Sequence, residues 1–314
     1  MKICLVSGGH LPIPSKNWGG VEVVLTNYLY ALKKLGHEVL ITNTKDLDLV
    51  VKTVNDWQPD FVHLHYDAYS DFLSKIDCDK KAITSHYPYI DKPSMAKIEG
   101  YDWIYEKLIR DDSYVFCLSE KNAEVFEKMG HQKEKLKLWN YGIDESKFQF
   151  SKRCTKPDKT ICLGKIESRK RQAFLQSSRC SIDFVGPVAD KTFRENSSDY
   201  LGVWERSEVY NNLTNYANLV LLSSGESAPQ VVYEALMAGL GVVVSEESTA
   251  NLDITLPFVD VVSNDIGRLE LRKVIQKNRE TSVNHRSEIR EYGLSNFSLT
   301  SCVENYVNII ELLD

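Results

Sequence analysis

Short apolar runs alternate with longer amphipathic segments along this chain, the pattern expected of strands followed by helices. The first run, residues 2–7, has the character of a buried parallel strand. The segment 21–35 repeats apolar side chains at helical spacing, and Gly36 follows it as a helix C′ residue. The same alternation predicts further strands in the first half at residues 37–42, 61–65, 81–86, 114–119 and 136–139.

A polar stretch at residues 145–159 interrupts this alternation and has the composition of a linker. The alternation then restarts. It predicts strands at residues 160–164, 182–187, 201–204, 219–223 and 241–245, with helices at 206–213 and 268–280. The chain closes with a predicted helix at 298–313, whose apolar side chains form one stripe.

Two successive series of strands and helices predict the α/β fold class. We expect two Rossmann-like domains, each with a parallel sheet, that face a central crevice. The first domain is placed at residues 1–150 and the second at 151–297, and the last helix, 298–314, is expected to pack back on the first domain. A length of 314 residues suits this division, because domains run roughly 100–200 residues.

Charge and hydropathy exclude some classes of protein. The chain has 38 Lys and Arg against 44 Asp and Glu, a formal net charge of −6, which argues against general nucleic-acid binding. The first apolar run is too short for a signal peptide, and no run reaches the ~18–20 apolar residues of a membrane span. We therefore expect a cytoplasmic protein, and leave contact with the membrane surface open.

The seven cysteines contain no C-x-x-C pair. Cys4, Cys117 and Cys162 lie inside apolar, strand-like runs. This placement indicates buried free thiols in a reducing compartment and argues against a metal or redox site.

The richest candidate site is the segment 223–235, which reads Ser-Ser-Gly-Glu-Ser-Ala-Pro-Gln-Val-Val-Tyr-Glu-Ala. Glu226 falls on the predicted strand-to-helix loop, and Glu234 about two turns into the helix at ~3.6 residues per turn. Both carboxylates would then border the carboxyl end of the sheet, where open α/β sheets bind ligands. Two carboxylates beside a helix N-terminus suit a ligand with hydroxyls and phosphates.

Four stretches, in order along nearly the whole chain, resemble the motifs of one family: the retaining glycosyltransferases of the GT-B fold, family GT4 (glycosyl transferases group 1). They are Gly8-Gly9-His10 through Trp18-Gly19-Gly20-Val21-Glu22 with 35–39, Asn140-Tyr141-Gly142-Ile143-Asp144 with Phe148, Gly164-Lys165-Ile166-Glu167-Ser168-Arg169-Lys170, and the seven-residue spacing of Glu226 and Glu234.

The resemblance implies roles for the second half. Lys165 and Lys170 would neutralise a diphosphate leaving group, although a solvated basic patch is the alternative. The family usually has Arg at the first position, and Lys165 keeps the charge without the bidentate fork. Glu234 would hold the nucleotide ribose, since a carboxylate accepts two vicinal hydroxyls. Glu226 would lie beside the transferred sugar, to orient it and stabilise positive charge at the anomeric carbon.

A helix N-terminus behind Glu226 is expected to present backbone N–H groups to sugar hydroxyls or phosphate oxygens. Its residues are Ser227, Ala228, Pro229 and Gln230. In the first half, Gly19 and Gly20 precede a helix, and let backbone approach the donor closely. A flexible turn is an equal reading of these two glycines, and the loop 10–17 beside them is a candidate clamp.

Three histidines compete for a role in the first half. His86 lies at the carboxyl end of a predicted strand and resembles a family histidine that reaches the donor sugar or the acceptor; a hydrogen-bonded core residue is the alternative. His63 and His65 share one face of their strand, but two ligands without a third give a weak metal signal. The triplets Asp46-Leu47-Asp48 and Asp77-Cys78-Asp79 lie away from the expected nucleotide site, so we predict no catalytic metal.

The resemblance implies a glycosyltransferase that moves a sugar, with retention and without a metal or other cofactor, from a UDP-sugar or GDP-sugar to a hydroxyl acceptor. Glycan, lipid-linked sugar, protein and small-molecule acceptors all remain open. A GT-B sugar-nucleotide epimerase is one alternative, and a non-catalytic nucleotide-sugar-binding protein is another. An NAD-dependent dehydrogenase is disfavoured, because Gly8-Gly9-His10 follows the first strand where G-x-G-x-x-G would be expected.

Overall fold

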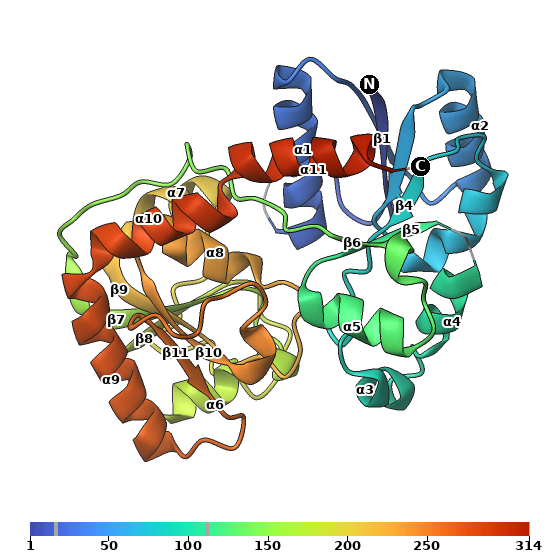
Figure 1. Cartoon of the computed structure of the whole chain (residues 1–314). Coiled ribbons are helices and arrows are strands. Elements are labelled where there is room, and N and C mark those ends of the chain that lie inside the picture. Colours follow the sequence, from blue (N-terminus) through green and yellow to red (C-terminus); the bar gives the residue numbers. More distant parts are fainter. Residues whose placement is uncertain (16–17, 111–112, 314) are drawn as a thin grey trace. The chain divides into compact units, whose positions relative to one another are not determined.

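The computed structural model describes residues 1–15, 18–110 and 113–313, with the side chain of Arg110 excepted (Figure 1). Within these ranges the chain forms two compact units. The first unit is Met1–Gly142 together with Leu299–Asp314, and the second is Ile143–Ser298.

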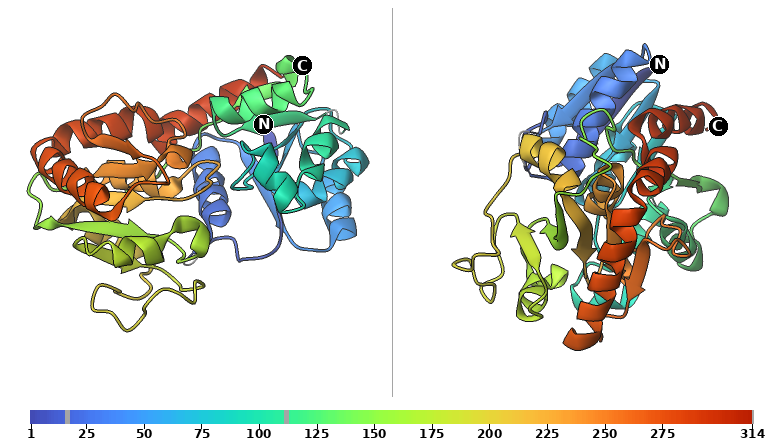
Figure 2. Two further views of the ribbon diagram at one scale, coloured as in Figure 1. Left: turned by 90° about the horizontal axis from the view of Figure 1, so that it is seen from below. Right: turned by 90° about the vertical axis from the view of Figure 1, so that its left-hand side faces the viewer.

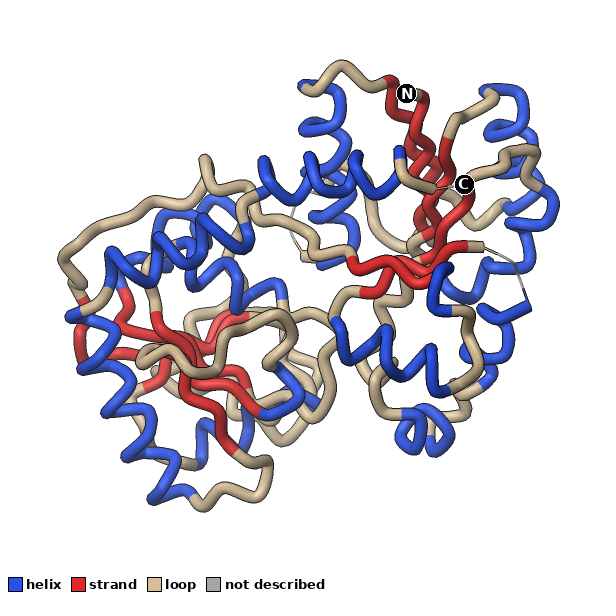
Figure 3. The backbone as a smooth tube through the Cα atoms, viewed as in Figure 1, coloured by secondary structure: helices blue, strands red, loops and turns tan. Residues whose placement is uncertain are grey.

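A parallel sheet forms the centre of the first unit (Figure 3). Its described strands lie in the spatial order β2 (Glu38–Asn43), β1 (Lys2–Ser7), β3 (Phe61–Leu64), β4 (Lys81–Ile83), β5 (Tyr114–Cys117) and β6 (Leu136–Leu138). Neighbouring strands pair in parallel throughout. The chain order reverses between β1 and β3, so the loops after these two strands lie at the topological switch point of this sheet.

Helices cover this sheet, and the last helix of the chain is one of them. They are α1 (Gly20–Lys34), α2 (Leu47–Trp57), α3 (Pro93–Ile98), α4 (Trp103–Arg110), α5 (Glu120–Lys128), α11 (Leu299–Glu311) and the 3-10 segments η1 (Asp67–Lys75) and η2 (Lys133–Lys135). Helix α11 lies against α1, as Figure 1 shows. Tyr306 of α11 is buried, with its hydroxyl 2.9 Å from His63 Nδ1 and its ring 5.2 Å from that of Tyr28.

A second parallel sheet forms the centre of the second unit. Its described strands lie in the order β11 (Val259–Val262), β10 (Gly241–Ser245), β9 (Tyr216–Leu221), β7 (Lys156–Leu163) and β8 (Ile182–Val185). All neighbouring pairs are parallel. Strands β7 and β9 are neighbours where the chain order reverses, which places the switch point of this sheet between their two loops.

The second unit contains further helices on this sheet. They are η3 (Ser168–Lys170), α6 (Gln172–Ser177), α7 (Arg206–Asn212), η4 (Leu213–Asn215), α8 (Gln230–Met237), η5 (Glu246–Ser248), α9 (Arg268–Asn284) and α10 (Arg286–Phe297). The views of Figure 2 show α9 running along the sheet, where it contacts β7, β9, β10 and β11. Helix α8 packs against β9, β10 and α10. Its burial accounts for its apolar residues on nearly every side.

The predicted α/β class with two parallel sheets is confirmed. Two local predictions are wrong. Residues 201–204 form no strand, because Gly202 takes a φ of 80° and leaves only a single bridge at Tyr200. The linker predicted for 145–159 ends early, because β7 begins at Lys156, and its polar first residues are exposed strand positions. Among the described helices, none combines the length and apolar character that a membrane span needs.

Candidate functional site

The predicted donor residues of the second unit meet at the switch point of its sheet. Strand β7 leads into the loop 164–171, and β9 leads into the loop 222–229. Because β7 and β9 are neighbours and parallel, both loops leave the same edge of the sheet. The backbone N–H of Ser224 donates to Arg169 O at 2.9 Å, which joins the two loops directly.

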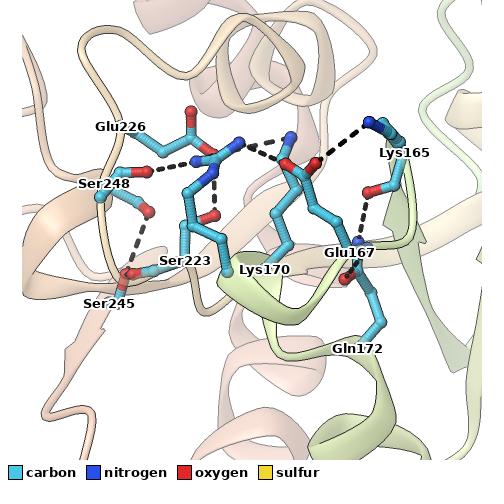
Figure 4. A network of polar contacts seen from close by, with 10 residues as sticks. Lys165, Glu167, Lys170, Gln172, Ser223, Glu226, Ser245 and Ser248 are labelled. Atoms are coloured by element: carbon cyan, nitrogen blue, oxygen red, sulfur yellow. Dashed lines mark hydrogen bonds and ion pairs between the residues drawn. The ribbon is translucent and has the colours of Figure 1, made fainter. Parts of the chain in front are cut away.

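Glu226 is held by cations from the other loop (Figure 4). Its Oε1 lies 3.0 Å from Arg169 Nη1 and 3.5 Å from Lys170 Nζ, and accepts from Ser223 Oγ at 2.7 Å. Burial alone would raise the pKa of Glu226, but Lys170 and Arg169 outweigh it and lower that pKa. The carboxylate is therefore ionised at neutral pH.

A row of alternating charges continues along the loop after β7. Glu167 accepts from Arg169 Nη2 at 2.6 Å and lies 3.5 Å from Lys165 Nζ. The side chain of Lys165 is 58% exposed, whereas that of Lys170 is 14% exposed. Figure 4 shows these ion pairs as one connected row. Arg169, which the sequence placed in the motif 164–170 without a role of its own, is thus the cation that bridges Glu167 and Glu226.

Two glycines allow the backbone to place Lys170. Gly164 has a φ of 138°, and a Cβ there would lie 3.3 Å from Lys170 Nζ. Gly186 has a φ of 142°, and a Cβ there would lie 2.0 Å from the carbonyl oxygen of Gly164. Side chains at these positions would displace either the ammonium or the strand end that supports it.

Glu234 lies on α8 and has one carboxylate oxygen without a partner. Glu234 is the fifth residue of the helix, which is just over one turn from its start at ~3.6 residues per turn. The predicted position, two turns into the helix, is wrong. Oε1 accepts from Arg206 Nη2 at 2.5 Å, and the residue is 1% exposed. Oε2 is buried and makes no hydrogen bond. An acceptor left unsatisfied in this way costs free energy unless a ligand donates to it.

Gln230 adds a second unpartnered group one helical turn before Glu234. Its Nε2 is also buried without a hydrogen-bond partner. Residues four apart lie on the same face of a helix, so α8 presents a donor and an acceptor side by side. Such a pair is complementary to a ligand with neighbouring hydroxyl and carbonyl groups.

The predicted helix N-terminus is only partly suited to its role. Helix α8 begins at Gln230, and Pro229 is its N-cap. Proline has no backbone N–H, so of the four predicted residues only Ser227, Ala228 and Gln230 can donate from the backbone. A cavity of about 440 Å³ lies elsewhere in the unit, near Pro157 and Ser181, and contains none of the predicted residues.

The first unit has its own cavity, of about 250 Å³, at its own switch point. Gly8 and His10 after β1 line it, as do His65 and Asp67 after β3. The predicted His86 lines it too. The sequence identified His86 at a strand end, but gave no sign that it shares a cavity with Asp67.

The three histidines have different surroundings. His63 is a core residue, with Nδ1 2.9 Å from the Tyr306 hydroxyl and Nε2 2.8 Å from Thr84 Oγ1. His65 Nδ1 lies 3.3 Å from His86 Nε2. Burial lowers the pKa of His86 to about 4 and that of His65 well below its usual value. Both imidazoles are therefore neutral at pH 7.

Asp67 is a buried carboxyl group that lines the same cavity. Its Oδ2 accepts from Ser85 Oγ at 2.8 Å. Burial raises the pKa of Asp67 to about 7, although Ser85 and Lys107 act in the opposite direction. Asp67 is a common residue type in this chain, and nothing in its sequence neighbourhood marks it.

Gly19 and Gly20 stand at the start of α1 in the first unit. Gly19 is its N-cap with a φ of 129°, and a Cβ there would lie 2.6 Å from Glu22 Oε2. The close approach of this backbone to a carboxylate explains the glycine. Of the candidate clamp 10–17, Lys16 and Asn17 lie outside the described residues.

No group of three or more His, Cys, Asp or Glu side chains in the described ranges is placed to hold a metal ion. Asp46 of the first acidic triplet instead caps α2 by accepting from Leu49 N at 3.0 Å. Each of the seven cysteines is a free thiol. Burial raises the pKa of Cys162 to about 12, which removes its thiolate character.

Asp67 predicts a specific dependence of stability on pH. Its folded pKa of about 7 lies above that of an unfolded aspartate. Its contribution to stability is therefore complete below about pH 4, falls by about 1.4 kcal/mol per pH unit towards pH 7, and is constant above that. Asp67→Asn removes the titrating carboxyl group and with it this dependence on pH. The melting temperature of the variant should therefore rise relative to that of wild type between pH 5 and 7, and the difference between the two should stay constant above pH 7.5. A constant difference in melting temperature between the two proteins from pH 5 to 9 would show that the pKa of Asp67 is not raised.

A scan against protein-family models and a search of curated proteins both find no match. Solved structures do match. HepE from Anabaena, in complex with UDP and glucose, is 14% identical with a TM-score of 0.77, over 100% of both chains. Sucrose-phosphate synthase from Thermosynechococcus elongatus is 13% identical with a TM-score of 0.80, over 99% of this chain and 98% of that one.

AviGT4, a glycosyltransferase involved in avilamycin A biosynthesis, is 15% identical with a TM-score of 0.69, over 99% of this chain and 97% of that one. Identities this low show a shared fold. The chain therefore has the GT-B fold, with two Rossmann-like units, as the motifs predicted.

Proposed function

We propose that this chain is a glycosyltransferase that moves a sugar from a nucleoside diphosphate to a hydroxyl acceptor, with retention of configuration. The observation that carries the proposal is the face of α8, where Gln230 Nε2 and Glu234 Oε2 are buried without hydrogen-bond partners. The match to HepE in complex with UDP and glucose supports the same reading, as does the glycosyltransferase AviGT4. The second unit would bind the donor, and the first the acceptor.

Each residue of the site has a task that fits its surroundings. Glu234 Oε2 would accept from the ribose hydroxyls, while Arg206 fixes the position of the carboxylate. Lys170 and Lys165 would face the diphosphate, where negative charge grows as the sugar leaves. Glu226 is ionised between Arg169 and Lys170, so it would orient the sugar and stabilise positive charge at the anomeric carbon.

The proposed reaction makes one bond and breaks one. The anomeric carbon loses the diphosphate oxygen and gains the acceptor oxygen on the same face, and the acceptor proton leaves with the diphosphate. Arg169, Lys165 and Lys170 supply positive charge along one loop, so we propose that the leaving group needs no divalent cation. His86 is neutral and lines the cavity of the first unit, where it would hydrogen-bond a sugar hydroxyl.

We propose that the donor carries either UDP or GDP. The proposed location is cytoplasmic, and contact with the membrane surface is left open.

An epimerase would use the same nucleotide site without an acceptor. A binding protein would keep the nucleotide affinity without turnover. Acceptor-dependent release of nucleoside diphosphate distinguishes the transferase from both alternatives, because only a transferase needs an acceptor to release the nucleotide.

The function is tested first by thermal shift with UDP, GDP, ADP and their sugars. A nucleotide at about 100 times its Kd should raise the melting temperature by roughly 5 °C or more. Release of nucleoside diphosphate is then followed with the stabilising donor and a pool of glycan, lipid-linked and small-molecule acceptors. Turnover should persist in excess EDTA. Stabilisation by none of these compounds would refute the donor assignment, and loss of turnover on chelation would refute the metal-free mechanism.

A further inference from the structure

The cavity at the switch point of the first unit is lined mainly by aromatic and acidic side chains, which is unusual for a site that binds phosphate. Tyr66, Tyr87 and Tyr101 line it together with the carboxyl groups of Glu22 and Asp67. Among the described residues that line this cavity, none is lysine or arginine. A surface of aromatic rings and hydrogen-bond acceptors is complementary to a polyhydroxyl ligand.

The tyrosine rings are held by one another. Tyr87 and Tyr101 are stacked with centroids 4.3 Å apart, and Tyr66 meets Tyr69 edge-on at 4.7 Å. Tyr69 also donates to the carbonyl of Gly8 at 3.2 Å. A Cβ at Gly8 would lie 3.0 Å from Tyr66 Cγ, so the backbone after β1 comes close to this ring. Rings fixed in this way lose little entropy when a ligand stacks on them.

The polar groups of the cavity are acceptors or neutral. Asp67 and Glu22 contribute carboxyl oxygens, and His65 and His86 are uncharged imidazoles at neutral pH because burial lowers their pKa values. His65 Nε2 is buried without a hydrogen-bond partner. None of these side chains supplies positive charge to a phosphate.

Lys107 is a cation whose charge acts on Asp67, where it opposes the rise in pKa caused by burial. Its ammonium lies 3.0 Å from Asp71 Oδ2, so it is already paired. The loop after β7 in the second unit differs sharply, since it carries Lys165, Arg169 and Lys170 in sequence. The two switch points thus have opposite chemistry: cations in one unit, and tyrosines with carboxyl groups in the other.

We propose that the cavity of the first unit binds an uncharged sugar ring of the acceptor and discriminates against a phosphorylated one. The ring stacks on the tyrosine surface, and its hydroxyls donate to Asp67 and Glu22. A phosphate placed here loses its water, meets no lysine or arginine among the described lining residues, and faces the carboxyl groups of Asp67 and Glu22. The cavity volume of about 250 Å³ suits one sugar ring and is too small for a nucleotide. This proposal rests on the proposed function, whose acceptor it specifies.

Ligand-observed NMR on the full chain tests the proposal. The probes are methyl glucoside and methyl galactoside against glucose 6-phosphate and galactose 6-phosphate, each with and without saturating UDP or GDP. A neutral glycoside should bind at least roughly tenfold more tightly than its phosphorylated counterpart. Tyr66→Leu should weaken glycoside binding roughly tenfold, whereas Tyr30→Leu, at an exposed tyrosine of α1, should not change it. The double variant Asp67→Asn with Glu22→Gln should reduce the ratio between the affinities for the neutral glycoside and the phosphorylated sugar.

The outcomes separate this proposal from the proposed function. Equal or tighter binding of a phosphorylated sugar would overturn it, as would equal weakening by Tyr66→Leu and Tyr30→Leu. Nucleotide binding without any glycoside binding would overturn it while leaving the donor site intact. Glycoside binding that depends on Tyr66 in a chain that binds no nucleotide would uphold the cavity assignment and refute the transferase.

Discussion

Replacing Lys170 by methionine is expected to lower kcat by roughly 100- to 1,000-fold, the loss seen when one preorganised charge-stabilising donor is removed. The ammonium lies at the switch point, only 14% exposed, beside the ionised Glu226. Charge on the leaving diphosphate grows during the reaction, so this cation acts more on the transition state than on the bound donor. The KM for the donor should therefore change far less than kcat.

The fold of the Lys170→Met variant should survive, because Glu226 keeps Arg169 at 3.0 Å and Ser223 at 2.7 Å. Lys170→Arg retains the charge and should restore part of the activity. The matched control is Lys273→Met at an exposed position of α9, which should leave kcat unchanged. A Lys170→Met enzyme with wild-type kcat would mean that the leaving group is stabilised elsewhere.

Replacing Glu234 by glutamine is expected to weaken nucleotide affinity roughly 10- to 100-fold, the worth of hydrogen bonds to a charged group. Glutamine can keep an oxygen near Arg206, but places an NH₂ group where the unpartnered Oε2 now lies. An amide NH₂ cannot accept from ribose hydroxyls. The loss should appear in both the Kd for the nucleoside diphosphate and the KM for the donor, with a smaller change in kcat.

The Glu234→Gln substitution is expected to lower the stability of the folded protein, because Arg206 loses its charged partner. The melting temperature of Glu234→Gln is therefore measured alongside its affinity, so that a folding defect is recognised. Glu270→Gln, an exposed carboxylate in the first turn of α9, is the matched control and should bind as wild type does. Full nucleotide affinity in a folded Glu234→Gln variant would refute the ribose role.

The pattern of the sequence was sufficient to predict both sheets, because parallel strands are short apolar runs that recur between amphipathic helices. It failed where that contrast disappears. Strand β11 (Val259–Val262) was missed because it is short and carries a polar Asp260. Residues 201–204 are short and apolar, but Gly202 takes a left-handed conformation there.

Some residues of the candidate site could be identified from the sequence, and others could not. Glu226 and Glu234 could be identified because their spacing within one strand–loop–helix segment fixes their positions. Arg206 and Asp67 could not, because their roles come from tertiary contacts. Arg206 reaches Glu234 across 28 residues, and Asp67 reaches Ser85 across 18. No local pattern encodes such a pairing.

We expect a nucleoside diphosphate to bind to the face of α8 at the switch point of the second unit. Isothermal titration of UDP and GDP into wild type, Glu234→Gln and Glu270→Gln tests it most directly. One of the two nucleotides should bind wild type and Glu270→Gln equally, and should bind Glu234→Gln roughly 10- to 100-fold more weakly. Binding of neither nucleotide to wild type, or equal binding to all three proteins, would contradict it.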